Sequence, residues 1–117
     1  MTAEDSKRRD DSVSGEVHAA ADLAAYQQGG IVSRVIFKNE GGSVTVFAFD
    51  RGQSLSEHTV PFDAVALILE GEAEIVVGGT RRKVPAGSLI RLPADVPHAV
   101  AAPVRFKMVL SMSRSRS

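Results

Sequence analysis

Two histidines are the residues in this sequence best suited to chemistry. The 117 residues include three histidines and no cysteine, so they offer no thiolate ligand, cysteine nucleophile or disulfide. An imidazole titrates at a pKa of about 6.5, so it can bind a divalent metal when neutral or exchange a proton near neutral pH. Each of His58 and His98 lies among short apolar stretches, whereas His18 has no such setting and is predicted to lie on the surface.

Short β-strands are the elements that must position these histidines. Glycine and proline interrupt the apolar stretches from residue 30 onward, and no long amphipathic helix competes with a β interpretation. Many short strands separated by glycine and proline are typical of a sandwich or barrel. Strands are predicted over 31–38, 43–50, 65–70, 73–77, 81–84, 88–92, 98–102 and 105–112, with one helical turn over 22–26.

Alternation within the last predicted strand identifies part of the core. Phe106, Met108, Leu110 and Met112 alternate with more polar neighbours, which is the period of two expected of a half-buried strand. These four side chains are predicted to face the interior. The glycine pairs 41–42 and 78–79 predict hairpins.

Composition predicts one domain without an electrostatic attraction to polyanions. Hydrophobic residues make up 44% of the sequence, and 14 basic residues balance 14 acidic ones. A net charge of zero gives no long-range attraction to nucleic acid or to an anionic membrane. No apolar run approaches the roughly 20 residues of a membrane span, and no signal peptide is recognised, so we expect a cytoplasmic protein. Residues 1–14 and 114–117 are predicted to be disordered tails around a single domain over 15–113.

Two motifs resemble a known family. The first has Gly52, a five-residue spacer, His58 and a closing Gly71. The second has Gly79, five residues, Pro85-x-Gly87, and then Pro93 followed by Pro97-His98. Together they resemble the two conserved motifs of the cupin superfamily over about residues 30–112. The resemblance implies an all-β fold, an antiparallel jelly-roll β-barrel.

The same resemblance implies a metal site, here with half of its ligands replaced. Cupins of known chemistry typically bind a divalent metal through three histidines and a glutamate. His58 and His98 match two of these positions, and Val60 and Ala64 stand at the other two. Two imidazoles would make a weak, water-completed site for Zn, Fe, Mn or Ni.

Asp63 is the spare carboxylate near this site. Strand parity points its side chain outward, whereas a bulge or turn at Pro61 would turn it inward as a third ligand. Both alternatives stay open at this point.

Parity also places apolar side chains beside the histidines. Positions 58, 60, 62 and 64 share one face in a regular strand. Val60, Phe62, Ala64 and Met108 are therefore predicted to form the apolar wall of a pocket for a small organic molecule. Two functions stay open: a binding module that uses the histidines as polar contacts, and an enzyme of the oxygenase, isomerase or epimerase class.

Unpaired strand edges lead us to predict the oligomeric state. An open sheet leaves unpaired strand edges, which a second copy can cover, so we expect a homodimer with residues 31–38 at the contact. The basic run from Arg81 to Lys83 is predicted to be a solvated edge.

Overall fold

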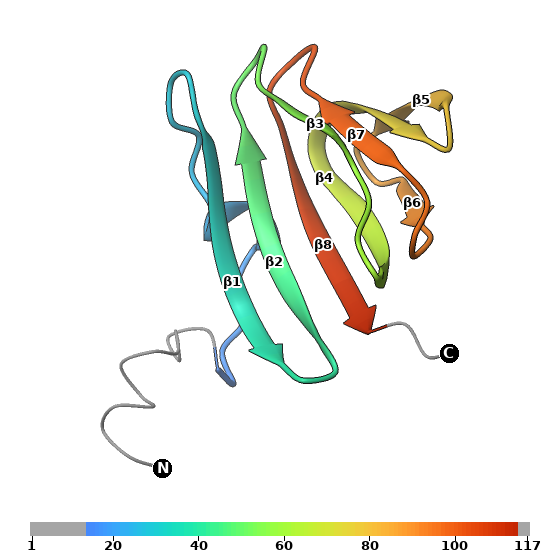
Figure 1. The fold of residues 1–117 in the computed structure, drawn as a ribbon. Helices are drawn as coiled ribbons and strands as arrows, with labels where there is room; N and C mark the ends of the chain where they lie inside the picture. The colour runs from blue at the N-terminus through green and yellow to red at the C-terminus, as the bar shows by residue number, and fades with distance from the viewer. Residues whose placement is uncertain (1–13, 115–117) are drawn as a thin grey trace.

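The chain forms one antiparallel sheet that curls into a half-barrel (Figure 1). The computed structural model describes residues 14–114, so the predicted tails lie outside the described residues except for Ser14 and Arg114. The strands run in the order β1-β2-β8-β4-β7-β3, and β5 and β6 also pair with β4. The predicted all-β jelly-roll class is confirmed. The elements are η2 (Ala20–Leu23), β1 (Ile31–Asn39), β2 (Gly42–Phe49), β3 (Ser54–His58), β4 (Phe62–Val77), β5 (Thr80–Pro85), β6 (Leu89–Leu92), β7 (His98–Ala101) and β8 (Phe106–Arg114).

The long strand β4 connects the two halves of the sheet. Its first part pairs with β6 and β8, and its last part pairs with β5 and β7. The predicted interruption at residues 70–72 is wrong, because the strand continues through it. The register against β8 shifts between Ile68 and Glu70, and Gly71 has a φ of 75°. A bulge with a glycine in the left-handed region bends a strand without ending it.

Alternate residues of each strand pack into one core inside the half-barrel. Phe49 and Phe106 lie at its centre with no exposed surface, and their rings stack at a centroid distance of 4.5 Å. Met108 is also buried, while Leu110 and Met112 pack against the core from its margin. The predicted inward face of the last strand is therefore confirmed.

The segment before β1 covers part of the outer face of the sheet. Ala24 packs on Val46 and Ala48 in a second apolar cluster. The Tyr26 hydroxyl donates to Glu70 Oε2 at 2.7 Å, and burial together with this carboxylate raises the pKa of Tyr26. This covering leaves only a portion of the outer face exposed.

Two cations of β8 and its approach hold the same segment. Lys107 Nζ donates to the carbonyl oxygen of Ala21 at 2.6 Å and lies 4.7 Å from the ring centre of Tyr26. Arg105 Nε donates to Asp50 Oδ1 at 2.8 Å, and the backbone N–H of Gly29 donates to Asp50 Oδ2 at 2.6 Å. These hydrogen bonds, that of Gly29 first, lower the pKa of Asp50. None of the described helices is long and apolar enough to cross a membrane.

Candidate functional site

His58 and His98 lie opposite each other at the ends of β3 and β7. They are register partners, and their ring centroids lie 4.4 Å apart with an angle of 63° between the rings. His98 lies two positions before the core residue Val100 on β7. Alternate residues of a strand share a face, so the side chains of His98 and Val100 both point to the inside of the half-barrel. His98 is buried, at 7% exposure, and His58 is exposed. The pair therefore lies at the border between the inner wall of the half-barrel and solvent.

An irregularity in β3 turns His58 toward the inside. Leu55 pairs with Val100 and His58 pairs with His98, so three steps on β3 match two on β7. In a regular strand Leu55 and His58 would face opposite sides, and a β-bulge lets both face the core. The sequence did not predict β3, because its Ser-Leu-Ser-Glu-His pattern carries only one apolar residue.

A turn between β6 and β7 sets the position of His98. Asp95 has a φ of 63°, a left-handed conformation that aspartate tolerates better than most residues. Its N–H donates to the carbonyl oxygen of Val60 at 2.9 Å, and Pro97 accepts from the N–H of Gly78 at 2.9 Å. Val60 lies in the loop between β3 and β4, so the predicted regular strand over 58–64 is interrupted there, while His58, Phe62 and Ala64 still face the inside.

Backbone carbonyls determine which ring nitrogens are free. His58 Nδ1 lies 2.9 Å from the carbonyl oxygen of Ser56, and His98 Nδ1 lies 3.4 Å from that of Val96. A carbonyl oxygen only accepts, so we assign the proton of each neutral ring to Nδ1 and the lone pair to Nε2. Both Nε2 atoms are therefore acceptors or metal ligands without a partner in the described chain.

His98 is held in its neutral form. Burial lowers its pKa below the ordinary value, His58 nearby adds to this, and the Val96 carbonyl opposes it. No buried side-chain nitrogen or oxygen of the described residues lacks a partner, so the free Nε2 of His98 must reach the accessible surface. A neutral imidazole open to solvent is a competent ligand at pH 7.

The pair supplies at most two ligands of a metal site and does not complete one. A shared zinc ion would need both Nε2 atoms within about 2.0–2.1 Å of it, and the ring centroids lie 4.4 Å apart. Within residues 14–114, no group of three or more His, Cys, Asp or Glu side chains gathers at one point. Water or a bound molecule would have to supply the other ligands.

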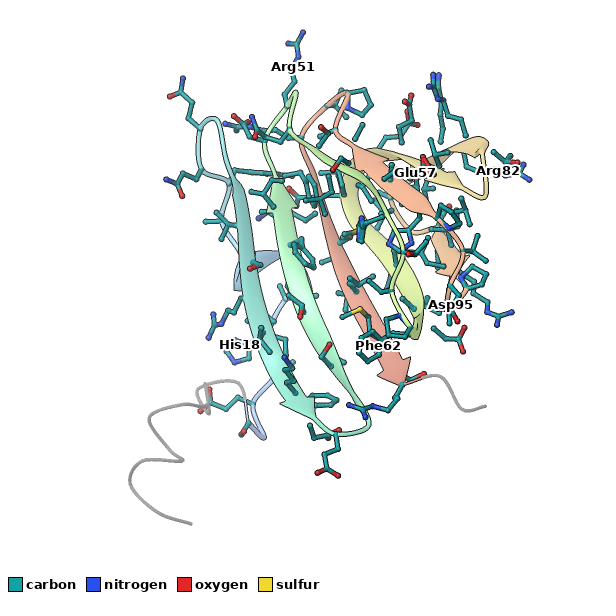
Figure 2. All side chains as sticks on the ribbon, in the orientation of Figure 1. His18, Arg51, Glu57, Phe62, Arg82 and Asp95 are labelled. Atoms are coloured by element: carbon teal, nitrogen blue, oxygen red, sulfur yellow. The ribbon has the colours of Figure 1, made fainter. Side chains whose placement is uncertain are left out.

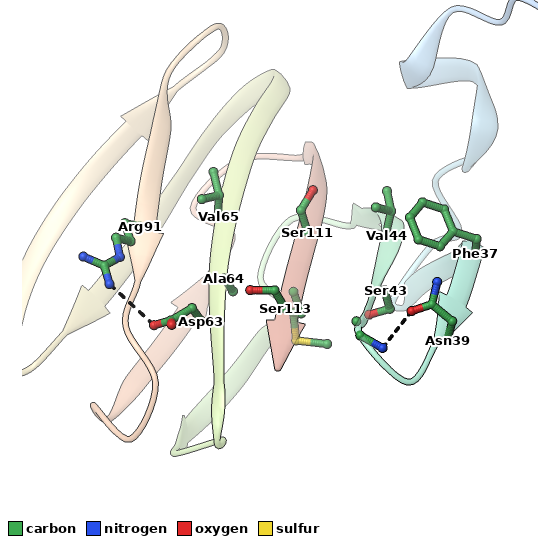
Figure 3. A pocket seen from close by; sticks show the side chains of 13 residues that line it. Phe37, Asn39, Ser43, Val44, Asp63, Ala64, Val65, Arg91, Ser111 and Ser113 are labelled. Atoms are coloured by element: carbon green, nitrogen blue, oxygen red, sulfur yellow. Dashed lines mark hydrogen bonds and ion pairs between the residues drawn. The ribbon is translucent and has the colours of Figure 1, made fainter. Parts of the chain in front are cut away.

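Asp63 lies away from the histidines. Its Oδ1 accepts from the N–H of Ala94 at 2.9 Å and lies 3.5 Å from Arg91 Nη2 (Figure 3). It follows Phe62 and precedes Ala64, which face the core, so it belongs to the outer face. The structure therefore favours the outward alternative.

The predicted wall residues are divided between core and loop. Ala64 and Met108 are buried in the core at 5% and 2% exposure, and Val60 lies in the β3–β4 loop. Phe62 is partly exposed at the lower end of the half-barrel, where it lines a cavity (Figure 2). Among the four predicted wall residues, Phe62 lines the cavity described in the further inference below.

The other residues singled out from the sequence lie outside this site. His18 is exposed, and its Nε2 lies 3.8 Å from Glu16 Oε2. Arg82 is exposed on the β4–β5 hairpin (Figure 2). Arg81 is also exposed, and its Nε lies 3.5 Å from Glu74 Oε1. Both observations agree with the predicted surface roles.

Comparison with known proteins identifies the family. The family model described as the cupin domain matches residues 45–111, more than half of the chain. The chain belongs to the cupin domain family. The matched segment contains both histidines. No curated protein matches the chain.

Solved structures share the fold over most of the chain. A conserved protein of unknown function from Streptococcus pyogenes is 30% identical, covers 89% of this chain and 90% of its own, and has a TM-score of 0.80. A cupin superfamily protein from Desulfitobacterium hafniense is 26% identical, with coverages of 86% and 93% and a TM-score of 0.82. A cupin 2 conserved barrel domain protein from Leptotrichia buccalis is 37% identical over 80% of this chain and 46% of that one, with a TM-score of 0.78.

Proposed function

We propose that the half-barrel binds a small organic molecule through His58 and His98, and that the pair also holds a divalent metal weakly. The observation that carries the proposal is the pair of Nε2 atoms without a partner among the described residues, beside the apolar core of the half-barrel. Apolar ligand sites commonly use a few such polar groups to orient the ligand.

The residues of the site have separate tasks in this proposal. Neutral His58 and His98 accept hydrogen bonds from the ligand or coordinate the ion through Nε2. The apolar core of the half-barrel, of which Met108 is a part, would contact the apolar part of the ligand. A bound divalent ion would supply Lewis acidity toward a ligand oxygen.

Removing either histidine is expected to abolish most metal binding. Titration of the wild-type protein with Zn²⁺ or Ni²⁺ should show one weak site, and His98→Ala or His58→Ala should lower the affinity at least about tenfold, or 1.4 kcal/mol. The reason is that a site with two protein ligands has none in reserve. Affinity should fall as the pH is lowered below about 6.5, since ligating imidazoles must be neutral. Isothermal titration calorimetry measures both effects.

His18→Ala is the matched control, because His18 is exposed and lies outside the pair. Its affinity should equal that of the wild-type protein. Absence of any Zn²⁺ or Ni²⁺ binding at millimolar concentration, or equal loss in the control, would show the metal part of the proposal to be wrong.

We further propose a homodimer that uses the outer face of the sheet. The residues Phe37, Val44, Ser111, Val65 and Arg91 are successive register partners across β1, β2, β8, β4 and β6 (Figure 3). Phe37 of this row is 54% exposed, and Leu89, two residues before Arg91 on β6, is 64% exposed. Nothing in residues 14–114 covers the row. Arg91 and Asp63 lie side by side at the end of this row. A two-fold axis through the patch would place Arg91 of one copy opposite Asp63 of the other. Such a patch is typical of an interface.

Phe37→Asp is expected to convert the dimer to a monomer. A buried carboxylate without a partner opposes association. Light scattering should give twice the 12.4 kDa chain mass for the wild-type protein and the single mass for the variant. Val104→Asp is the control, because Val104 is similarly exposed but lies outside the row. A monomeric wild-type protein at micromolar concentration would contradict the proposal.

A further inference from the structure

A cavity lies at the lower end of the half-barrel, and neither histidine of the pair lines it. It has a volume of about 240 Å³ and lies between the β1–β2 hairpin and the residues where β4 begins and β8 ends. Phe62, labelled at this end in Figure 2, forms one wall.

The deeper surface of this cavity is apolar. Phe62 and Met112 lie on the inner face of β4 and β8, and both are partly buried. Val35 of β1 faces them and is 48% exposed, which is unusual for an inward-facing valine. These three side chains would lose contact with water if an apolar group of a ligand were bound between them.

Two hydroxyl groups line the same cavity without partners. Ser43 and Thr45 alternate on the inner face of β2 and are only 9% and 8% exposed. Neither side chain has a hydrogen bond to any described residue, and no fully buried polar atom is left unpaired. Their hydroxyls must therefore open onto the cavity. A nearly buried hydroxyl that reaches the cavity can donate to the oxygen of a bound ligand in place of water.

Charged side chains surround the opening. Lys38 of β1 and Arg114 at the end of β8 contribute two positive charges, and Glu40 of the β1–β2 hairpin contributes one negative charge. All three are exposed, and none forms an ion pair within residues 14–114. The opening thus carries a net positive charge that the fold does not neutralise.

We propose that this cavity binds a small organic anion, with a compact apolar body against Phe62 and Met112 and a carboxylate near Lys38 and Arg114. The hydroxyls of Ser43 and Thr45 donate to its oxygen atoms. This site goes beyond the proposed function, since it uses different residues from the histidine pair. Its volume suits a single-ring acid.

Phenylacetate and its neutral amide, phenylacetamide, test the charge requirement. The acid should bind the full-length protein at least about fivefold more tightly, because charge-assisted hydrogen bonds exceed neutral ones. The double variant K38Q/R114Q should lose this preference. Glu40→Gln should strengthen phenylacetate binding by about two- to fivefold, since it removes a repelling charge. Arg82→Gln, an exposed cation on the distant hairpin, should leave the affinity unchanged.

Thr45→Val tests the hydroxyl and separates a binding role from a structural one. Valine keeps the shape and removes the unpartnered hydroxyl, so it should weaken phenylacetate binding at least about threefold. It should not lower the melting temperature, because the hydroxyl has no hydrogen bond to any residue within 14–114. A lowered melting temperature would mean a structural role. Equal binding of acid and amide, an unaffected double variant, or no binding of phenylacetate at millimolar concentration would each overturn the proposal.

Discussion

Replacing Gly71 with alanine is expected to destabilise the protein by more than about 3 kcal/mol. Gly71 has a φ of 75°, and an added Cβ would collide with the carbonyl oxygen of Arg105 and lie 2.9 Å from two atoms of Phe106. The obstructing atoms are largely backbone, so no side-chain rotation relieves the clash. This residue lies where β4 passes from one half of the sheet to the other.

Gly79→Ala is the matched control. Gly79 has a similar φ of 85°, but nothing lies within 4 Å of the added Cβ. Only the left-handed conformation is then penalised, at about 1–2 kcal/mol. Urea unfolding of both variants measures the difference. Equal losses would show that the close approach of β8 at Gly71 contributes nothing.

Phe106→Ala is expected to cost about 3–5 kcal/mol. The ring has no exposed surface and stacks on Phe49 at 4.5 Å with an angle of 15° between the planes. Its removal leaves a cavity at the centre of this core, and the strands on both sides limit collapse into it. The same urea experiment gives the loss in the free energy of unfolding.

Val104→Ala provides the comparison, because Val104 is 47% exposed and two residues away in the chain. Its expected cost is below about 0.5 kcal/mol, as for most surface substitutions. A loss below about 1.5 kcal/mol for Phe106→Ala would mean that the core repacks around the missing ring.

The strands could be predicted from the sequence because apolar residues, which become buried, recur at every second position. Phe106 and Met108 alternate with Lys107 and Val109, and the structure places the first two in the core. The burial of Lys107 was not predictable in this way. Its Nζ bonds to Ala21, 86 residues earlier in the chain, and no local pattern reports a contact of that range.

The candidate site could likewise be predicted only in part from the sequence. The spacing of glycines, prolines and histidines identified His58 and His98 and the family that the comparisons confirm. The predicted regular strand over 58–64 is interrupted by the loop at 59–61, which contains Val60 and which a period of two cannot anticipate. Asp63 lies on the outer face beside Arg91, the orientation that strand parity predicted.

The sequence by itself determined the all-β class, the inward face of β8 and the two histidines, since each depends on residue types at short spacings. Only the tertiary structure decided which polar groups meet. The contact between His58 and His98 depends on a register shift. The cavity containing Ser43 and Thr45 depends on the packing of the β1–β2 hairpin beside β4 and β8, which are distant from it in sequence. The physical reason is that register and sheet curvature arise from packing between strands, and a single strand's pattern carries no record of its partner.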